Sequence, residues 1–144
     1  MFVVDTNGLI DAANADSPEH ERRRELLEGW RAAREPWYTT SAILYECARV
    51  VTHPRVLPQP WNARAALEFV AALRATPSHR ILVESERHAA VAKELAAAIP
   101  GLAGNLFHDF HTAVLMREHG IARVYTRDAD FRRFGFLEVI DPLA

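Results

Sequence analysis

Short apolar runs alternate along the chain with longer segments in which apolar residues recur every three to four positions. The first run, residues 2–5, ends in a carboxylate and predicts a strand. The segment TNGLIDAA after it predicts a helix with Thr6 or Asn7 as its cap. Strands that alternate with helices of ten or more residues favour an α/β fold with three α/β/α layers around a central, mostly parallel sheet.

The other elements are predicted in the same way. Short apolar runs indicate strands, apolar residues repeated every three to four positions indicate helices, and the flanking residues mark where each element begins and ends. Further strands are predicted at residues 37–39, 80–84, 122–126 and 137–140. Further helices are predicted at residues 17–33, 41–51, 61–74, 85–98 and 105–120, with a short helix or turn at 128–134. Ser85 and Asn105 are the expected N-caps of two of these helices, Gly120 is an expected C-cap, and Leu67 is expected to face the core.

Length and composition limit the class of protein. The chain has 144 residues, which suits one domain spanning residues 1–144. It carries 17 Lys and Arg against 19 Asp and Glu, and 49% of its residues are hydrophobic, so neither a disordered chain nor a strongly basic nucleic-acid binder is indicated. No apolar stretch approaches the ~20 residues that cross a bilayer, and no signal-peptide pattern is present, so we expect a cytoplasmic protein without a membrane partner.

The number of cysteines limits the cross-links and metal sites that the chain can form. Cys47 is the only cysteine, so an intramolecular disulfide and a cysteine-based zinc site are excluded. We expect its side chain to be a small buried apolar group rather than a nucleophile. Any metal must therefore be held by carboxylates or histidines.

Four carboxylates stand at positions where the predicted fold would gather them. Asp5 ends the first strand and Asp128 follows the strand at 122–126, and the carboxyl ends of parallel strands line one crevice. Glu46 borders the apolar stripe of the helix at 41–51, and Asp109 lies about one turn into the helix at 105–120. Each acid also has a simpler interpretation, as a cap, a salt-bridge partner or a charge favoured by the helix dipole.

Taken together, the four acids favour a metal site. Carboxylates that converge on one crevice repel one another unless a cation neutralises them. All-oxygen ligation suits Mg²⁺ or Mn²⁺. Such an ion activates a bound water and polarises a phosphoryl oxygen, so hydrolytic cleavage of a phosphodiester is the predicted reaction.

Four segments, in this order along the chain, resemble a known family. They are VVDTNGLI near the start, Tyr45-Glu46, HDFHTAVLMREHG and TRDADFRRF. The ordered set resembles the PIN-domain ribonucleases, and specifically the VapC-type toxins of toxin–antitoxin systems. The resemblance implies a PIN-like fold and an Mg²⁺- or Mn²⁺-dependent endoribonuclease, with the four acids above at the family's acidic positions.

The resemblance also implies supporting residues and partners. Thr6, Asn7 and Thr126 fall at small polar positions that steady the acids, and Asp130 is a fifth acid, at a position that often serves to cap the short helix. The implied partners are an RNA substrate, a cognate VapB-type antitoxin laid over the active site, and a second copy of the chain in a homodimer. We expect Leu26, Leu27 and Trp30 to offer an apolar surface to the antitoxin.

Several residues and two rival functions are left open by the sequence. His108 and His111 flank Asp109 and are expected at the surface, without a ligand role. Arg127 and Arg132 flank Asp128 and are expected to meet RNA phosphates, whereas the cluster at 22–24 is expected on a solvated helix face. The rivals are a catalytically inactive PIN-like binding module and a phosphatase with an aspartate nucleophile, although Asn7 stands where that phosphatase needs a second acid.

Overall fold

The computed structural model describes residues 1–144 and contains one five-stranded sheet. Its strand order is β3-β2-β1-β4-β5, and every neighbouring pair is parallel. The strands are β1 (Phe2–Val4), β2 (Trp37–Thr40), β3 (His79–Leu82), β4 (Arg123–Tyr125) and β5 (Glu138–Ile140). The predicted parallel sheet is therefore confirmed.

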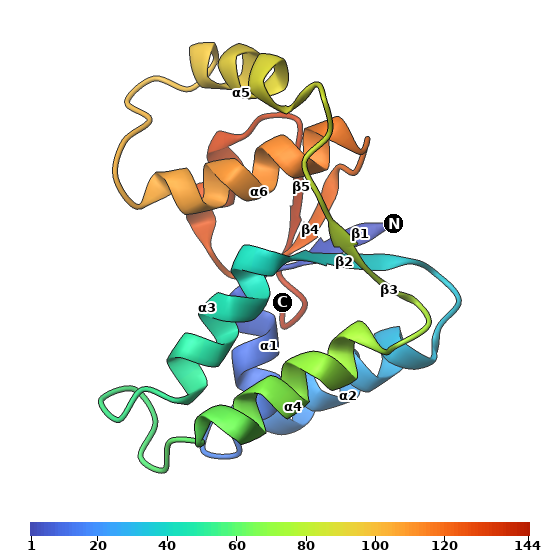
Figure 1. Cartoon of the computed structure of the whole chain (residues 1–144), viewed down its shortest axis with the longest axis vertical. Coiled ribbons are helices and arrows are strands. Elements are labelled where there is room, and N and C mark those ends of the chain that lie inside the picture. Colours follow the sequence, from blue (N-terminus) through green and yellow to red (C-terminus); the bar gives the residue numbers. More distant parts are fainter.

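Helices cover both faces of this sheet. They are α1 (Thr6–Ala13), α2 (His20–Ala32), α3 (Ser41–Val51), α4 (Ala63–Arg74), α5 (His88–Ala97), α6 (Leu106–Glu118) and a short 3₁₀ helix, η1 (Ala129–Arg133). Helices α1 to α4 lie on one side of the sheet, and α5 and α6 lie on the other (Figure 1). Right-handed crossovers produce this division, because the chain moves outward from β1 to β3 and then returns past β1 to β4.

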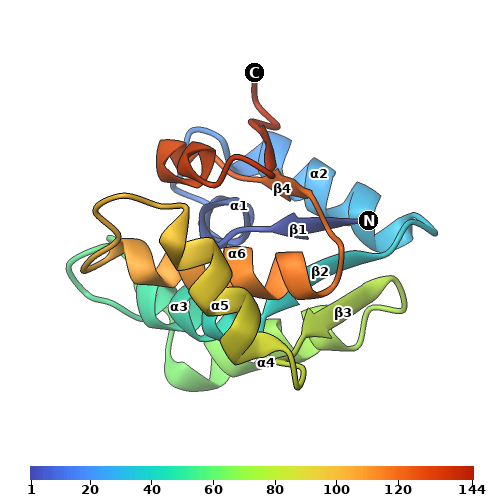
Figure 2. The ribbon, with the colours of Figure 1, turned by 90° about the horizontal axis from the view of Figure 1, so that it is seen from above.

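The central strand is the most deeply buried element. All three residues of β1 are buried, as expected for a parallel strand covered on both faces. Val3 is in register with Tyr38 of β2 and with Val124 of β4. The view from above shows β1 between these two strands (Figure 2). The end of β1 is therefore the middle of the sheet's carboxyl edge, where the order of strands reverses.

Several predicted boundaries shift by a few residues. Helix α2 begins at His20 rather than at residues 17–19, and α4 begins at Ala63, with the Asn62 side chain accepting a hydrogen bond from the Ala65 amide. Strand β3 covers His79–Leu82 instead of 80–84. Val83 lies beyond the strand and is 62% exposed, so its apolar character does not reflect burial.

Three predicted side-chain roles are wrong. Ser85 is not the N-cap of α5, which begins at His88 with Arg87 before it; the Ser85 hydroxyl donates to Glu118 and accepts from the Arg87 amide in the preceding turn. Asn105 precedes α6 but makes no capping hydrogen bond, because its own backbone is already helical. Leu67 is 52% exposed, since it lies on the outer side of the helix whose inner side buries Ala66 and Leu73.

The predicted stop of α6 at Gly120 is confirmed. Gly120 has φ of 67°, a left-handed conformation that glycine adopts at little cost. Its amide bonds to the Arg117 carbonyl, and the next amide, of Ile121, bonds to the Met116 carbonyl. These paired bonds form a Schellman motif, and they direct the chain into β4.

Burial confirms one expectation and corrects another. Cys47 is fully buried, and burial raises the pKa of its thiol to about 12, so it is an inert core residue. Arg23, in contrast, is 1% exposed and lies inside the α1–α2 layer, not on a solvated helix face. None of the helices is both long and apolar enough to cross a membrane.

Candidate active site

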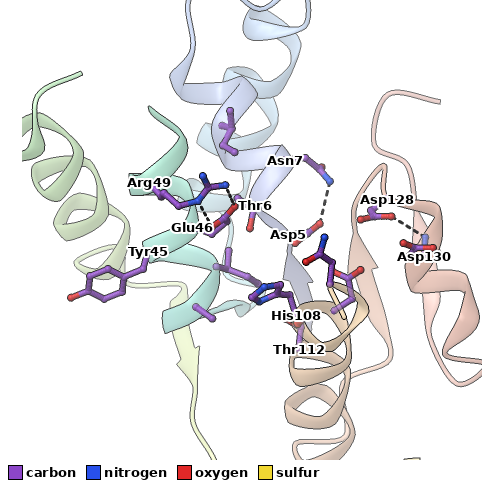
Figure 3. Close-up of a pocket in the computed structure, with 15 residues that line it drawn as sticks. Asp5, Thr6, Asn7, Tyr45, Glu46, Arg49, His108, Thr112, Asp128 and Asp130 are labelled. Carbon is purple, nitrogen blue, oxygen red and sulfur yellow. Dashed lines mark hydrogen bonds and ion pairs between the residues drawn. The ribbon is translucent and has the colours of Figure 1, made fainter. Parts of the chain in front are cut away.

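The carboxyl ends of β1 and β4 open into a cleft of ≈ 620 Å³. Residues from α1, α3, α6 and the segment after β4 form its walls (Figure 3). Fifteen residues line it: Asp5, Thr6, Asn7, Ile10, Ala42, Ile43, Tyr45, Glu46, Arg49, Asn105, His108, Asp109, Thr112, Asp128 and Asp130. All four predicted acids are among them, as are three of the four predicted supporting residues.

Asp5 is held at the centre of the cleft by neighbouring side chains. It is the residue between β1 and α1, its backbone is extended, and its side chain makes no capping hydrogen bond to the helix. Its Oδ2 accepts from Thr126 Oγ1 at 2.8 Å and from Asn7 Nδ2 at 3.1 Å. Because both side-chain donors bind Oδ2, Oδ1 remains for a ligand. Burial nevertheless raises the pKa of Asp5.

Thr126 is the one predicted supporting residue that lies behind the cleft wall. It is 1% exposed, and its hydroxyl also accepts from Asn7 Nδ2 at 2.9 Å and from the Asp128 amide at 3.0 Å. One hydroxyl thus connects the end of β1 to the start of η1. Thr126 and Asn7 thus both contact Asp5, and the steadying role expected of them stays a prediction.

Three further aspartates gather opposite Asp5. One carboxylate oxygen from each of Asp109, Asp128 and Asp130 lies within 4.8 Å of the others. Asp128 also caps η1, with Oδ1 accepting from the Asp130 amide at 2.9 Å. Burial raises the pKa of Asp109 to about 7, with further contributions from Asp128, Asp5 and Asp130.

Glu46 lies in the same cleft but has a cationic partner. Its two oxygens accept from Arg49 Nε at 2.9 Å and Arg49 Nη2 at 2.6 Å, one helical turn away. These hydrogen bonds lower the pKa of Glu46. Glu46 and Arg49 lie on one side of the cleft and Asp128 and Asp130 on the other, with Asp5 between them (Figure 3). In this structure Glu46 therefore forms a salt bridge with Arg49, which is the simpler interpretation that the sequence allowed for it.

Sequence reasoning missed several cleft residues. Arg49 is the only arginine or lysine in the lining, and its i,i+3 spacing from Glu46 was the available signal. Asn105, His108 and Thr112 reach the cleft from one side of α6 because they lie three to four residues apart. The expectation that His108 would be a simple surface residue is incomplete, since it lines the cleft, whereas His111 does not.

The structure also shows where the residues expected to contact RNA or the antitoxin lie. Arg132 is exposed and makes no ion pair with the protein, but Arg127 Nε lies 3.8 Å from Asp141 Oδ2. Leu27 is 4% exposed and belongs to the core, and Trp30 packs against the rings of Phe2, Trp37 and Tyr125. The expectation that Leu27 offers an outer docking surface is therefore wrong.

The donor set of the cleft fits a hard divalent cation. Asp5, Asp109, Asp128 and Asp130 supply only carboxylate oxygens, the ligands that Mg²⁺ and Mn²⁺ prefer. The raised pKa of Asp109 comes first from burial and then from the negative charge of Asp128, Asp5 and Asp130, and a bound cation would offset both effects. The one arginine of the cleft lining, Arg49, is already engaged by Glu46.

Comparison with known proteins identifies the family. The sequence profile of the PIN domain matches residues 2–137, nearly the whole chain. The chain belongs to the PIN domain family. This PIN domain is 35% identical over 143 residues to Ribonuclease VapC43 of Mycobacterium tuberculosis, covering 99% of this chain and 96% of the relative. It is 31% identical over 140 residues to Ribonuclease VapC48 of the same species, covering 97% and 96%. The resemblance to VapC-type proteins is thus confirmed.

Solved structures support the fold of this PIN domain. VapC20 of Mycobacterium tuberculosis, described as a sarcin-ricin loop cleaving toxin, superposes with a TM-score of 0.69 at 24% identity, covering 96% of this chain and 98% of the other. The FitAcB structure from Neisseria gonorrhoeae gives a TM-score of 0.70 at 21% identity, covering 99% of each chain. At these identities the likeness establishes the three-layer α/β/α architecture.

Proposed function

We propose that this PIN domain is a divalent-metal-dependent endoribonuclease and the toxin of a toxin–antitoxin pair. The observation that carries the proposal is the convergence of Asp5, Asp109, Asp128 and Asp130 in one cleft at the carboxyl edge of the sheet. Relatives named as VapC ribonucleases support the choice of RNA as the substrate.

Each group of cleft residues has a distinct part in this function. The four aspartates would hold Mg²⁺ or Mn²⁺, and Glu46 would join them if Arg49 turned toward the substrate. When bound, the metal would activate a water and polarise the phosphoryl oxygen. Asn7 and Thr126 fix one oxygen of Asp5, which reduces the reorganisation that metal binding requires.

Positive side chains near the cleft would bind the RNA backbone. Arg132 is exposed and free of ion pairs, and Arg49 lines the cleft itself. Arginine recognises phosphate oxygens with paired hydrogen bonds, which positions an RNA strand without reading its bases. We therefore assign phosphate binding to Arg49 and Arg132.

A cleavage assay tests this function. We expect purified protein to cut a long RNA internally with Mg²⁺ or Mn²⁺ present, and EDTA to stop the reaction. Asp5→Asn or Asp109→Asn should lower the rate at least 10–100-fold, because each change removes a metal-binding charge from a near-isosteric side chain. Asp16→Asn is the matched control, since Asp16 is an exposed aspartate outside the cleft.

Other results would favour the rival functions. Binding of RNA without cleavage, in protein of verified fold and with either metal, would indicate a binding module. Hydrolysis of a phosphomonoester, with RNA left intact, would indicate the phosphatase.

We also propose a cognate antitoxin as partner, and a homodimer as the assembly. Structures similar to this chain include VapBC2 from Rickettsia felis and FitAB, which are described as bound to DNA fragments. An acidic cleft suits an antitoxin arginine or lysine. Next to it, an apolar groove of ≈ 200 Å³ runs between α3 and α4, and Tyr45 lines both cavities.

The continuity of the two cavities suggests how an antitoxin would bind. An amphipathic segment could fill the groove beside Leu67 while its basic residue enters the cleft. We expect Leu67→Asp to weaken a co-purified antitoxin complex at least 10-fold while RNA cleavage persists, because Leu67 is exposed and outside the cleft. Val56→Asp, at an exposed apolar side chain elsewhere, is the control. Equal weakening by both variants would refute this docking site.

A further inference from the structure

A second group of potential metal ligands lies outside the acidic cleft. It consists of Glu84 after β3, His88 at the start of α5 and His111 on α6. Helices α5 and α6 lie side by side in both views of the fold (Figures 1 and 2). None of the three residues lines the cleft. The group is therefore independent of the proposed nuclease site.

Helix geometry separates the two groups. Asp109 and His111 are two residues apart on α6, which turns their side chains about 200° from each other around the helix axis. Asp109 faces the cleft, and His111 faces α5, with its ring 5.7 Å from the ring of His88. The same helix thus carries an acidic group on one side and an imidazole group on the other.

The distances within this second group suit one small cation. Glu84 Oε1 lies 3.6 Å from His88 Nε2 and 3.3 Å from His111 Nε2. One ligand atom from each residue lies within 4.8 Å of the other two. Zn²⁺ holds nitrogen and oxygen ligands at about 2.0–2.2 Å in a tetrahedron, which separates neighbouring ligand atoms by about 3.3–3.6 Å. The atoms need to move little to share an ion.

A buried carboxylate orients His88 for this role. The Glu118 side chain is 0% exposed, and its Oε2 lies 2.6 Å from His88 Nδ1. Its other oxygen, Oε1, accepts from the Ser85 amide at 2.9 Å and the Ser85 hydroxyl at 2.6 Å. A carboxylate that binds Nδ1–H keeps the proton there and leaves the Nε2 lone pair directed at Glu84 and His111. This carboxylate–histidine arrangement is the usual support for a metal-binding imidazole.

We propose that Glu84, His88 and His111 form a zinc site distinct from the acidic cleft. Two imidazoles and one carboxylate favour Zn²⁺ over Mg²⁺, which prefers oxygen ligands. The three side chains are 60%, 22% and 38% exposed, so water can occupy the fourth position. The site joins the segment before α5 to α6. This junction needs support, because Leu95 is the only buried residue of α5.

Metal titration of chelator-treated protein tests the site. We expect calorimetry to show one Zn²⁺ bound per chain outside the cleft, and Co²⁺ in its place to give the intense visible absorption of a tetrahedral site. His88→Gln and His111→Gln should each weaken this binding at least 100-fold. Glu118→Gln should weaken it 10–100-fold, because it removes only the orienting carboxylate.

Controls separate this site from the acidic cleft and from unfolding. Asp109→Asn should leave the zinc site intact, and His53→Gln, in the loop after α3, should bind as the parent does. Glu84→Gln changes an exposed side chain and so tests the ligand set in protein that keeps its fold. Hydrogen exchange at residues 85–95 should slow when Zn²⁺ is added. Zinc binding that survives His88→Gln, His111→Gln and Glu84→Gln, or that disappears in Asp109→Asn, would overturn the proposal, as would the absence of binding.

Discussion

At the scale of single residues, Thr126 determines how the acidic cleft is assembled. Its buried hydroxyl donates to Asp5 and accepts from the side chain of Asn7 and the amide of Asp128. It therefore links β1, α1 and η1 through one oxygen atom. Valine has nearly the same shape but cannot form any of these bonds, so it isolates the contribution of the hydroxyl.

We expect Thr126→Val to weaken metal-dependent cleavage about 10–100-fold and to lower the free energy of unfolding by about 1–3 kcal/mol. Metal titration of the cleavage rate and urea denaturation measure the two effects. Thr39→Val is the matched control, since Thr39 is also a buried threonine whose hydroxyl is hydrogen-bonded, in this case to His79 Nε2 at 2.9 Å, and it does not line the cleft. A similar loss of activity in both variants would show that Thr126 acts only through stability.

The pKa of Asp109 predicts how the metal-free protein responds to pH. Burial and the neighbouring aspartates raise this pKa from 3.8 to about 7 in the folded protein. The folded state therefore keeps a proton that the unfolded state releases, so stability falls as pH rises from about 4 to about 7. Asparagine is neutral throughout this range and removes the effect.

In EDTA, Asp109→Asn should melt above the parent protein at pH 8 and together with it at pH 4. Discounted for partial exposure, the gain at pH 8 is about 1–2 kcal/mol, or roughly 3–8 °C in a protein of this size. Calorimetry at the two pH values measures it. A melting difference that does not change with pH would argue against a raised pKa.

At the scale of elements, a buried arginine lies where α2 packs on α1. Arg23 Nε lies 3.7 Å from Asp11 Oδ2, and none of its three nitrogens has a hydrogen-bond partner in the protein. A Cβ at Gly8 would stand 3.2 Å from Val4 Cγ1, closer than ordinary contact, and 3.5 Å from Arg23 Nη1, so little space is left for a side chain there. Burial lowers the pKa of Arg23, and Asp11 opposes this effect.

Mutation of Asp11 and mutation of Arg23 should change the free energy of unfolding by different amounts. Asp11→Asn leaves the buried guanidinium without its nearest counter-charge and should cost about 2–4 kcal/mol. Arg23→Met keeps the aliphatic volume, removes the buried charge, and should be neutral or stabilising by about 1 kcal/mol. Urea denaturation of both variants measures the difference. A larger loss for Arg23→Met than for Asp11→Asn would mean that the guanidinium contributes net stability.

At the scale of the whole molecule, the cleft joins parts of the chain that are far apart in sequence. Asp5 follows the first strand, Asp109 lies on α6, and Asp128 and Asp130 flank the start of η1. An ion bound by all of them would connect the central strand to elements on both of its sides. Metal binding should therefore stabilise the entire fold by mass action.

We expect Mg²⁺ or Mn²⁺ at 100 times its dissociation constant to raise the free energy of unfolding by about 2.7 kcal/mol. Thermal melting with and without the ion measures this stabilisation. It should be lost in Asp109→Asn and retained in Asp16→Asn, whose side chain lies outside the cleft. Equal stabilisation of both variants would place the ion elsewhere.

Three features of this protein could be predicted from its sequence: the order of strands and helices along the chain, the parallel α/β architecture, and the acids at the carboxyl ends of β1 and β4. These features follow from local rules, because backbone geometry sets the periods of helices and strands and because parallel strands place their ends at one edge. The end of α6 could also be predicted from the local sequence, because glycine readily adopts the left-handed conformation that Gly120 has there.

Which side chains contact one another, in contrast, became known only from the folded structure. Asp130 joins the acid cluster while Glu46 pairs with Arg49, Arg23 is buried although its neighbours Arg22 and Arg24 are exposed, and His88 meets His111 across two helices. These outcomes depend on distances of a few ångströms between elements distant in sequence. Helical or strand periodicity fixes the direction of a side chain on its own element, but only packing fixes what stands opposite to it.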